Sequence, residues 1–193
     1  MKQVRKLSLL GVASAMCVVG IGVTSAGAAP TRVAHASQAH VIKTKKLSFN
    51  ASYHGTVKIL WTSTGASGTM SATGKATTLG TGSLVATGET KSFSTSSSSD
   101  PLSGTAVLKG AGGSLSISAV NVSAATTAAA APTSSAPDPV VISGTVKVTK
   151  GTGKFAGAKG TLNVHATFTV STTTGADSQS FVTTLKGTLS VKA

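Results

Sequence analysis

The chain has 193 residues, of which 17 are Lys or Arg, only 4 are Asp or Glu, and one is cysteine. A single cysteine excludes an intramolecular disulfide, and four acids leave few candidates for carboxylate chemistry. Glutamate occurs only at Glu89, whereas Thr, Ser, Gly and Val recur, which favours strands over charged amphipathic helices.

The N-terminus has the pattern of a secretory signal peptide over residues 1–28. A short basic start precedes an apolar run over residues 8–23, and Ala26-Gly27-Ala28 offers a cleavage site. A second site at Ala34-His35-Ala36 leaves the mature start open by several residues. The alternative is a single transmembrane anchor, but the run is shorter than the ~20 residues needed to span a bilayer.

Cys17 lies inside that apolar run and follows Met16, which does not fit a lipoprotein signal. The exported chain then keeps no cysteine, which suits a bacterial envelope better than a small disulfide-rich module. We therefore expect a secreted or cell-envelope-associated protein with no membrane span once processed. Its strong positive charge points to anionic polymers or surfaces as partners. Nucleic acid is not expected, because Arg32 is the only arginine left and aromatic residues are scarce.

Residues 29–44 show no period and are predicted to be a flexible lead, followed by a β-domain over 45–193. From Leu47 to Trp61, odd positions are apolar and even positions polar with few exceptions, which indicates an extended chain with one buried face. The run is predicted to bend or to pair with itself near Gly55. The last strand, in "SFVTTLKGTLSVKA", alternates in the same way, and we expect the first and last strands to pair and close a barrel.

Between these strands a unit beginning Ser-Gly-Thr recurs at Ser67, Ser103 and Ser143, each time followed by a strand, a glycine-rich turn and a returning strand. About eight strand-like runs at roughly 8–15-residue spacing predict a single antiparallel β-barrel, with a β-sandwich as the alternative. Two stretches interrupt this pattern: a polar loop over 95–101 and a low-complexity loop over 123–140 that could instead form a helical turn.

The segment "GTGKFA" matches a dinucleotide-binding fingerprint by letter, but that motif must open a helix. Residues 160–170 alternate instead as a strand, so we interpret the segment as a hairpin turn. Phe155 is expected to fold over the end of the core. The glycines are expected to supply positive φ; they are Gly151, Gly153, Gly157 and Gly160.

This hairpin, "SGTVKVTKGTGKFAGAKGTLNV", resembles the G-T-G-x-F-x-G-A-x-G hairpin of the allene oxide cyclase and dirigent superfamily. The resemblance covers about 25 residues and implies an eight-stranded antiparallel barrel with an apolar lumen. Enzymes of that superfamily use acidic and polar residues inside the barrel. The acids of this chain are expected in loops and turns rather than on a buried face, so no catalytic residue is assigned; they are Glu89, Asp100, Asp138 and Asp177.

Two groups of side chains are candidate binding residues. Phe49, Tyr53 and Trp61 share one strand face and either line a ligand cavity or fill the core of a small barrel. Four lysines of the hairpin either form an anion-binding patch or protect exposed strands from aggregation; they are Lys147, Lys150, Lys154 and Lys159. No metal site or cofactor is expected, because two histidines in the domain and acids in loops do not make a ligand set.

Three functions remain open from the sequence. The first is a secreted barrel that binds a small hydrophobic molecule in its lumen. The alternative is a structural or adhesion domain of the cell envelope that holds anionic wall polymers on its basic surface. A cyclase-like enzyme is the weakest of the three.

Overall fold

The structure is a computed structural model of the chain, and it describes residues 43–92, 99–126 and 131–193. The predicted signal peptide and the predicted lead up to residue 42 lie outside the described residues.

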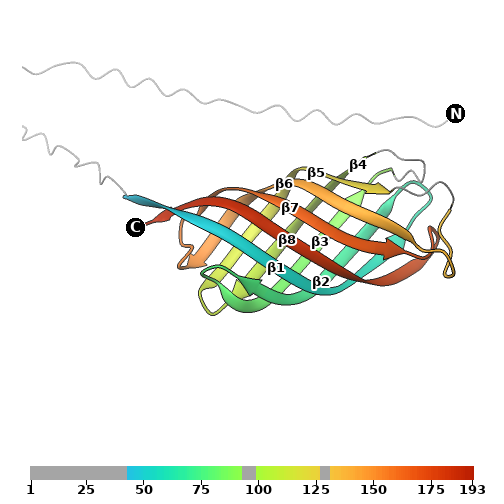
Figure 1. Cartoon of the computed structure of the whole chain (residues 1–193). Coiled ribbons are helices and arrows are strands. Elements are labelled where there is room, and N and C mark those ends of the chain that lie inside the picture. Colours follow the sequence, from blue (N-terminus) through green and yellow to red (C-terminus); the bar gives the residue numbers. More distant parts are fainter. Residues whose placement is uncertain (1–42, 93–98, 127–130) are drawn as a thin grey trace, which may run out of the picture. The chain divides into compact units, whose positions relative to one another are not determined.

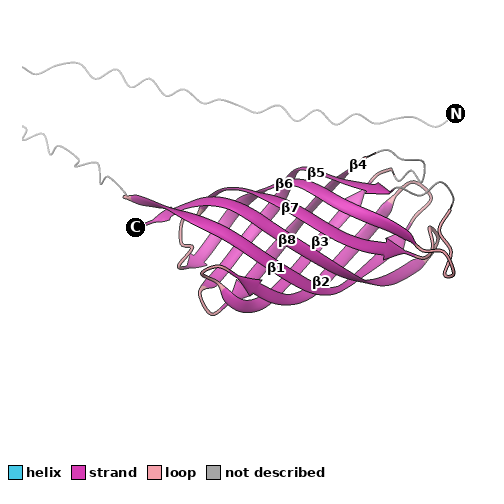
Figure 2. Ribbon diagram, viewed as in Figure 1, coloured by secondary structure: helices cyan, strands magenta, loops and turns pink. Residues whose placement is uncertain are grey.

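Eight strands form one closed antiparallel barrel in which each strand pairs with the next and β8 returns to β1 (Figure 1, Figure 2). The predicted all-β barrel is confirmed, and the sandwich alternative is wrong. The strands are β1 (Thr44–Trp61), β2 (Ala66–Ala76), β3 (Gly80–Thr90), β4 (Asp100–Gly110), β5 (Gly113–Thr126), β6 (Asp138–Gly153), β7 (Lys159–Val170) and β8 (Ala176–Lys192).

The first and last strands close the barrel along a continuous ladder that runs from Thr44 opposite Lys192 to Leu60 opposite Ala176. β1 does not pair with itself; it is one strand that also pairs with β2 from Ala51 onward. Gly55 allows the two strands to approach closely, because a Cβ there would lie 2.1 Å from the carbonyl oxygen of Ser71.

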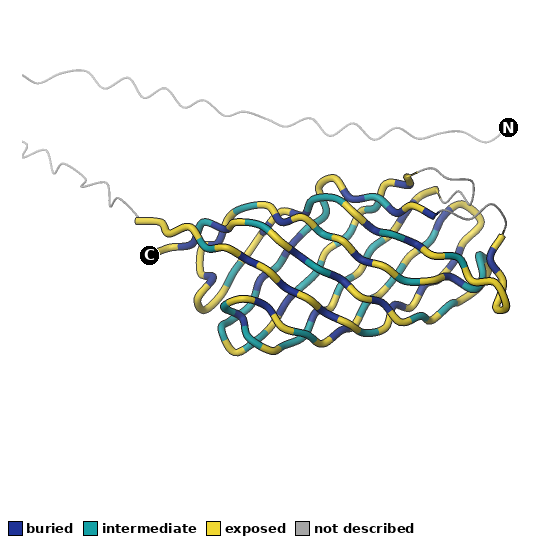
Figure 3. The backbone as a smooth tube through the Cα atoms, viewed as in Figure 1, coloured by how far each residue is buried: buried dark blue, intermediate teal, exposed yellow. Residues whose placement is uncertain are grey.

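Apolar and polar side chains alternate along the strands as the sequence predicts, so buried and exposed positions follow each other along the chain (Figure 3). The inward side chains form one core that every strand shares. The outward face is covered mainly by Ser, Thr and Lys. A barrel of eight strands has an interior just wide enough for its side chains to fill or for one small ligand.

The two ends of the barrel differ in their connections. One end, which we call the turn end, carries the start of β1, the end of β8 and three short turns at 77–79, 111–112 and 154–158 (left in Figure 1). The other, which we call the loop end, carries the connections at 62–65, 91–99, 127–137 and 171–175.

Strands take up part of each of the two stretches predicted as interrupting loops. β4 already begins at Asp100, inside the predicted loop over 95–101. β5 continues to Thr126 and β6 begins at Asp138, so strands take up both ends of the predicted loop over 123–140. Within the connection, Thr133 and Ala136 form an isolated antiparallel bridge.

Candidate functional site

Aromatic side chains fill the turn end of the lumen. Phe49, Tyr53 and Phe155 are fully buried there, and the rings of Phe49 and Phe155 meet edge to face at 5.9 Å and 81°. The wall around them includes a row of glycines on neighbouring strands: Gly74, Gly82, Gly110, Gly113 and Gly153. A Cβ at Gly74 would lie 2.8 Å from Cδ1 of Tyr53, so this glycine makes room for the ring.

The hairpin turn between β6 and β7 carries Phe155 into the lumen. The Phe155 N–H donates to the Thr152 carbonyl at 3.1 Å, and the Phe155 carbonyl accepts from the Ala158 N–H at 2.9 Å. Three of the four glycines expected to have positive φ do so: Gly153, Gly157 and Gly160. Gly151 does not have a positive φ. Glycine is required at this position because a Cβ would lie 2.0 Å from the Phe155 carbonyl oxygen.

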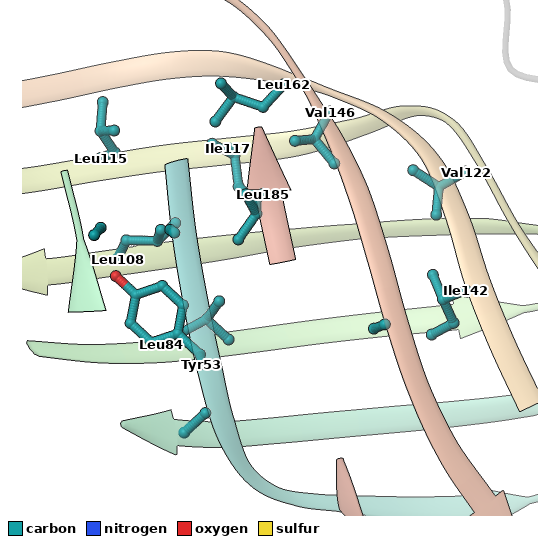
Figure 4. Packing of buried hydrophobic residues seen from close by; sticks show 14 of the residues in the cluster. Tyr53, Leu84, Leu108, Leu115, Ile117, Val122, Ile142, Val146, Leu162 and Leu185 are labelled. Atoms are coloured by element: carbon teal, nitrogen blue, oxygen red, sulfur yellow. The ribbon is translucent and has the colours of Figure 1, made fainter. Parts of the chain in front are cut away.

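Tyr53 is buried without a polar partner. Its hydroxyl makes no hydrogen bond in the part of the chain that the structure describes, and it points among leucine side chains in Figure 4. Desolvation by burial raises the pKa of this phenol above its usual value of 10.0. The group is therefore held neutral and unsatisfied.

A second row of glycines crosses the barrel wall nearer the loop end. Gly68, Gly88 and Gly104 are direct cross-strand partners on β2, β3 and β4, and all three occupy inward positions. A Cβ at Gly68 would meet only Lys58 O at 3.7 Å and Val57 Cγ2 at 4.0 Å, and one at Gly88 only Ser103 O at 3.3 Å. At Gly104, by contrast, the Thr87 carbonyl oxygen lies 2.4 Å away. Close packing therefore requires glycine at position 104 but leaves space beside Gly68.

Two small cavities of about 120 Å³ and about 90 Å³ lie in the lumen beside this second row. Met70, Gly88, Leu102 and Ile142 line both of them. The larger cavity extends from Leu84 of β3 toward β5–β8. Its wall there includes side chains seen in Figure 4: Ile117, Val122, Ile142, Val146 and Leu185. The smaller one extends toward Trp61, Phe168 and Val170 at the loop end.

The cavity walls are almost entirely apolar. Thr183 is the buried hydroxyl of the larger cavity, and it donates its proton to the His165 carbonyl at 3.2 Å, so it has no donor left for a ligand. A cavity without polar groups to hold water stays dry and accepts apolar molecules; an engineered cavity of about 150 Å³ binds benzene. These cavities thus suit small apolar molecules.

The predicted aromatic residues lie at different places. Trp61 lines the smaller cavity, whereas Phe49 and Tyr53 line neither cavity and pack at the turn end. The sequence did not indicate Gly68, Gly88, Met70 or Leu102. The sequence did contain a signal for two of the three glycines of the second row. The Ser-Gly-Thr units at Ser67 and Ser103 contain Gly68 and Gly104, which lie in that row.

The four hairpin lysines are all exposed, on the outward face or in the turn. Lys150, Lys154 and Lys159 lie at the turn end, whereas Lys147 lies further along β6, opposite Thr161.

One acid, Asp100, is buried although the sequence predicts it in a loop. Asp100 is the first residue of β4 and is only 6% exposed, so the expectation that no acid is buried was wrong. It lines neither lumen cavity. Asp177 is bound into a local network at the loop end: its Oδ2 accepts from the Ser171 N–H, and its Oδ1 accepts from Gln179 Nε2, both at 2.7 Å.

Across residues 43–92, 99–126 and 131–193, no three His, Cys, Asp or Glu side chains gather as a metal site. Within those same ranges, no helix is long and apolar enough to cross a membrane. No protein-family model, curated protein or solved structure matches the chain.

Proposed function

We propose that the protein is an exported barrel that binds a small apolar molecule in its lumen. The observation that carries this proposal is the contrast between the two glycine rows. At the turn end, Tyr53 packs against Gly74, and backbone atoms lie within 2.5 Å of a Cβ at each of the other glycines of the row. Nearer the loop end, Gly68 and Gly88 border space that no side chain occupies.

Neither Gly68 nor Gly88 has a positive φ, so the backbone conformation does not require glycine at these positions. Glycine inside a strand weakens it through its conformational entropy and its lack of a packing side chain. An alanine at position 68 would have room. Glycine at this point therefore costs stability and leaves the cavity open, which supports a binding role for the space.

The cavity dimensions limit the ligand. Pockets for drug-sized molecules are about 300–1,000 Å³, and the cavities of about 120 and 90 Å³ are well below that range. We infer a molecule no larger than benzene for either cavity alone. Met70 lines both cavities, and its unbranched thioether chain adapts readily to neighbouring groups. A shift of Met70 would join the cavities for a longer ligand.

We also propose membership of the allene oxide cyclase and dirigent superfamily, supported by the hairpin motif and by the eight-stranded antiparallel barrel. A binding role is favoured over cyclase-like catalysis. Glu89 is the one carboxyl residue that lines either cavity, and it lies on the exposed face of β3.

Trp61 provides the test, because it is the only tryptophan in the chain and lines the smaller cavity. Titration with benzene should change Trp61 fluorescence and raise the unfolding temperature. Gly68→Ala should weaken both effects, and Met70→Ala should strengthen binding of longer apolar molecules. Ser71→Ala, on the outward face of the same strand, is the control and should leave binding unchanged.

Absence of any fluorescence or thermal response at saturating benzene would contradict the proposal. Native mass spectrometry of protein purified from its source should additionally show a bound small molecule, which extraction into organic solvent would identify.

A further inference from the structure

The charges of the barrel are separated along its axis. Nine of the described lysines lie at the turn end, within four residues of a strand terminus or in a turn: Lys43, Lys45, Lys46, Lys75, Lys109, Lys150, Lys154, Lys159 and Lys192. All four acids of the chain lie at the loop end: Glu89, Asp100, Asp138 and Asp177. Asp100 and Asp138 are the first residues of strands that start there, and Asp177 is the second residue of another. Glu89 is the last residue but one of a strand that ends there. The turn end is therefore strongly basic, with no carboxylate side chain near it to offset the charge.

Contacts in the structure bring several of these lysines together. The aliphatic stem of Lys192 lies across the β6–β7 turn, since a Cβ at Gly157 would meet its carbons at 3.0–3.2 Å. That turn carries Lys154, and β7 begins directly after it with Lys159. Ser190 is opposite Lys159 on one side and Lys46 on the other. Because neighbouring strands lie about 4.8 Å apart, the backbones at Lys46 and Lys159 are roughly 10 Å apart.

An outer hollow of about 500 Å³ adjoins this basic region, between β1 and the β2–β3 turn. Its wall includes Asn50, Ser52, Lys75 and Thr77. Lys186 of β8 is the cross-strand partner of Asn50 on the same outward face, just as Lys75 is the partner of Ser52. Hydroxyl, amide and ammonium donors thus surround the hollow.

The composition of the turn end discriminates between anionic partners. Insertion into a membrane needs exposed apolar side chains, but the exposed large hydrophobic residues of the described chain lie away from this end: Leu60, Val85, Val120 and Val182. Binding of single-stranded nucleic acid uses stacking on aromatic rings, and no aromatic side chain in the described ranges is exposed. The described cations are all lysines, which bind phosphate as point charges on flexible side chains and so impose no fixed orientation on the bound group.

We propose that the turn end is a docking surface for a flexible polymer of phosphate groups, such as a poly(glycerol phosphate) chain. The polymer lies over the lysines of the β6–β7 turn and the start of β1. The acidic loop end is held away from it by repulsion, so the barrel is oriented with its loop end outward.

The test is the binding of a poly(glycerol phosphate) chain of fixed length to the purified protein, measured over a range of salt concentrations. With four to six phosphates neutralised, the logarithm of affinity should fall against the logarithm of salt with a slope of about −3 to −4. The triple variant Lys154→Gln, Lys159→Gln, Lys192→Gln should bind about 100-fold more weakly at low salt, since each lysine near an anionic surface contributes about a factor of five.

The matched control is Lys58→Gln, Lys91→Gln, Lys147→Gln, which removes the same charge outside the turn end and should change affinity less than about threefold. The variant with Lys→Arg at positions 154, 159 and 192 should retain binding. That result would show that the glutamine variant loses affinity because it loses charge and not because it misfolds. Equal losses in the two triple variants would overturn the proposal, because net charge alone would then account for binding. Binding to vesicles of anionic phospholipid without binding to the soluble polymer would also overturn it, in favour of a membrane.

Discussion

Replacing Gly68 with alanine tests whether glycine leaves unfilled space in the lumen. A Cβ at this position would lie 3.7 Å from Lys58 O and 4.0 Å from Val57 Cγ2, which are ordinary van der Waals distances. The backbone φ is not positive, so alanine adopts the same conformation without strain. The added methyl group would point inward, beside the smaller cavity.

Two contributions set the expected magnitude. Alanine reduces the conformational entropy of the unfolded chain, which stabilises the fold by about 0.4–1 kcal/mol. Burial of one methyl group contributes about 0.8 kcal/mol more. We therefore expect the free energy of unfolding to rise by about 1–2 kcal/mol. For a domain of this size, each kcal/mol raises the unfolding temperature by roughly 2–4 °C.

Gly104→Ala is the matched control, because Gly104 lies in the same row and also faces inward. Its Cβ would lie 2.4 Å from the Thr87 carbonyl oxygen and 3.0 Å from the Gly88 Cα, so the backbone must shift. Overpacking of this kind costs about 1–3 kcal/mol. Urea unfolding of the two variants should give changes of opposite sign. Destabilisation by both substitutions would refute the inference that the space beside Gly68 is open.

The remaining predictions concern the filled end of the lumen. Tyr53→Phe should stabilise the protein by about 1–3 kcal/mol, because it removes a buried hydroxyl without a partner; a loss of stability in urea unfolding would indicate a partner for that hydroxyl. Because burial raises the Tyr53 pKa, the unfolded chain loses this proton at lower pH than the folded protein does. Above roughly pH 10, the free energy of unfolding should therefore fall by up to about 1.4 kcal/mol per pH unit, until the pH passes the pKa of the folded state. The slope should be absent in Tyr53→Phe, and its persistence there would assign it to another group. Phe155→Ala should cost about 3–5 kcal/mol, whereas the exposed Val85→Ala should cost less than about 1 kcal/mol; comparable losses would show that Phe155 does not close the core.

The barrel itself could be predicted from the sequence because strand alternation is a local property. Each of the strands over Leu47–Trp61 and Phe181–Val191 shows which side chains face inward without reference to its neighbours. Closure between the first and last strands followed from the need to protect both edges of the sheet.

The cavities could not be predicted, because they depend on register between strands. Gly68, Gly88 and Gly104 are 20 and 16 residues apart in sequence and become neighbours only through the pairing of β2, β3 and β4. Whether each glycine is required or leaves space depends on the distance from its Cβ position to the nearest atom, which is 3.7 Å at Gly68, 3.3 Å at Gly88 and 2.4 Å at Gly104. The β5–β6 ladder adds two irregularities. β6 has an extra residue, Thr149, between the partners of Ser116 and Ile117, and β5 has an extra residue, Val120, between Ala119 and Asn121; both shift the inward positions along that wall of the larger cavity.

The separation of charge was visible in principle. In an up-and-down barrel, strand ends alternate between the two ends of the molecule, so acids at strand positions such as Asp100 and Asp138 gather at one end. The proline after each of these two acids indicated a loop instead, which concealed the pattern. The hairpin lysines indicated only a fraction of the basic surface.

The most direct test of the account is a crystal structure of the protein under xenon pressure. The account predicts xenon density in the lumen between Met70, Gly88 and Leu102, with Trp61 and Ile142 in the surrounding walls. Side chains closed over that space, or ordered water in it, would contradict the claim that the lumen holds small apolar molecules.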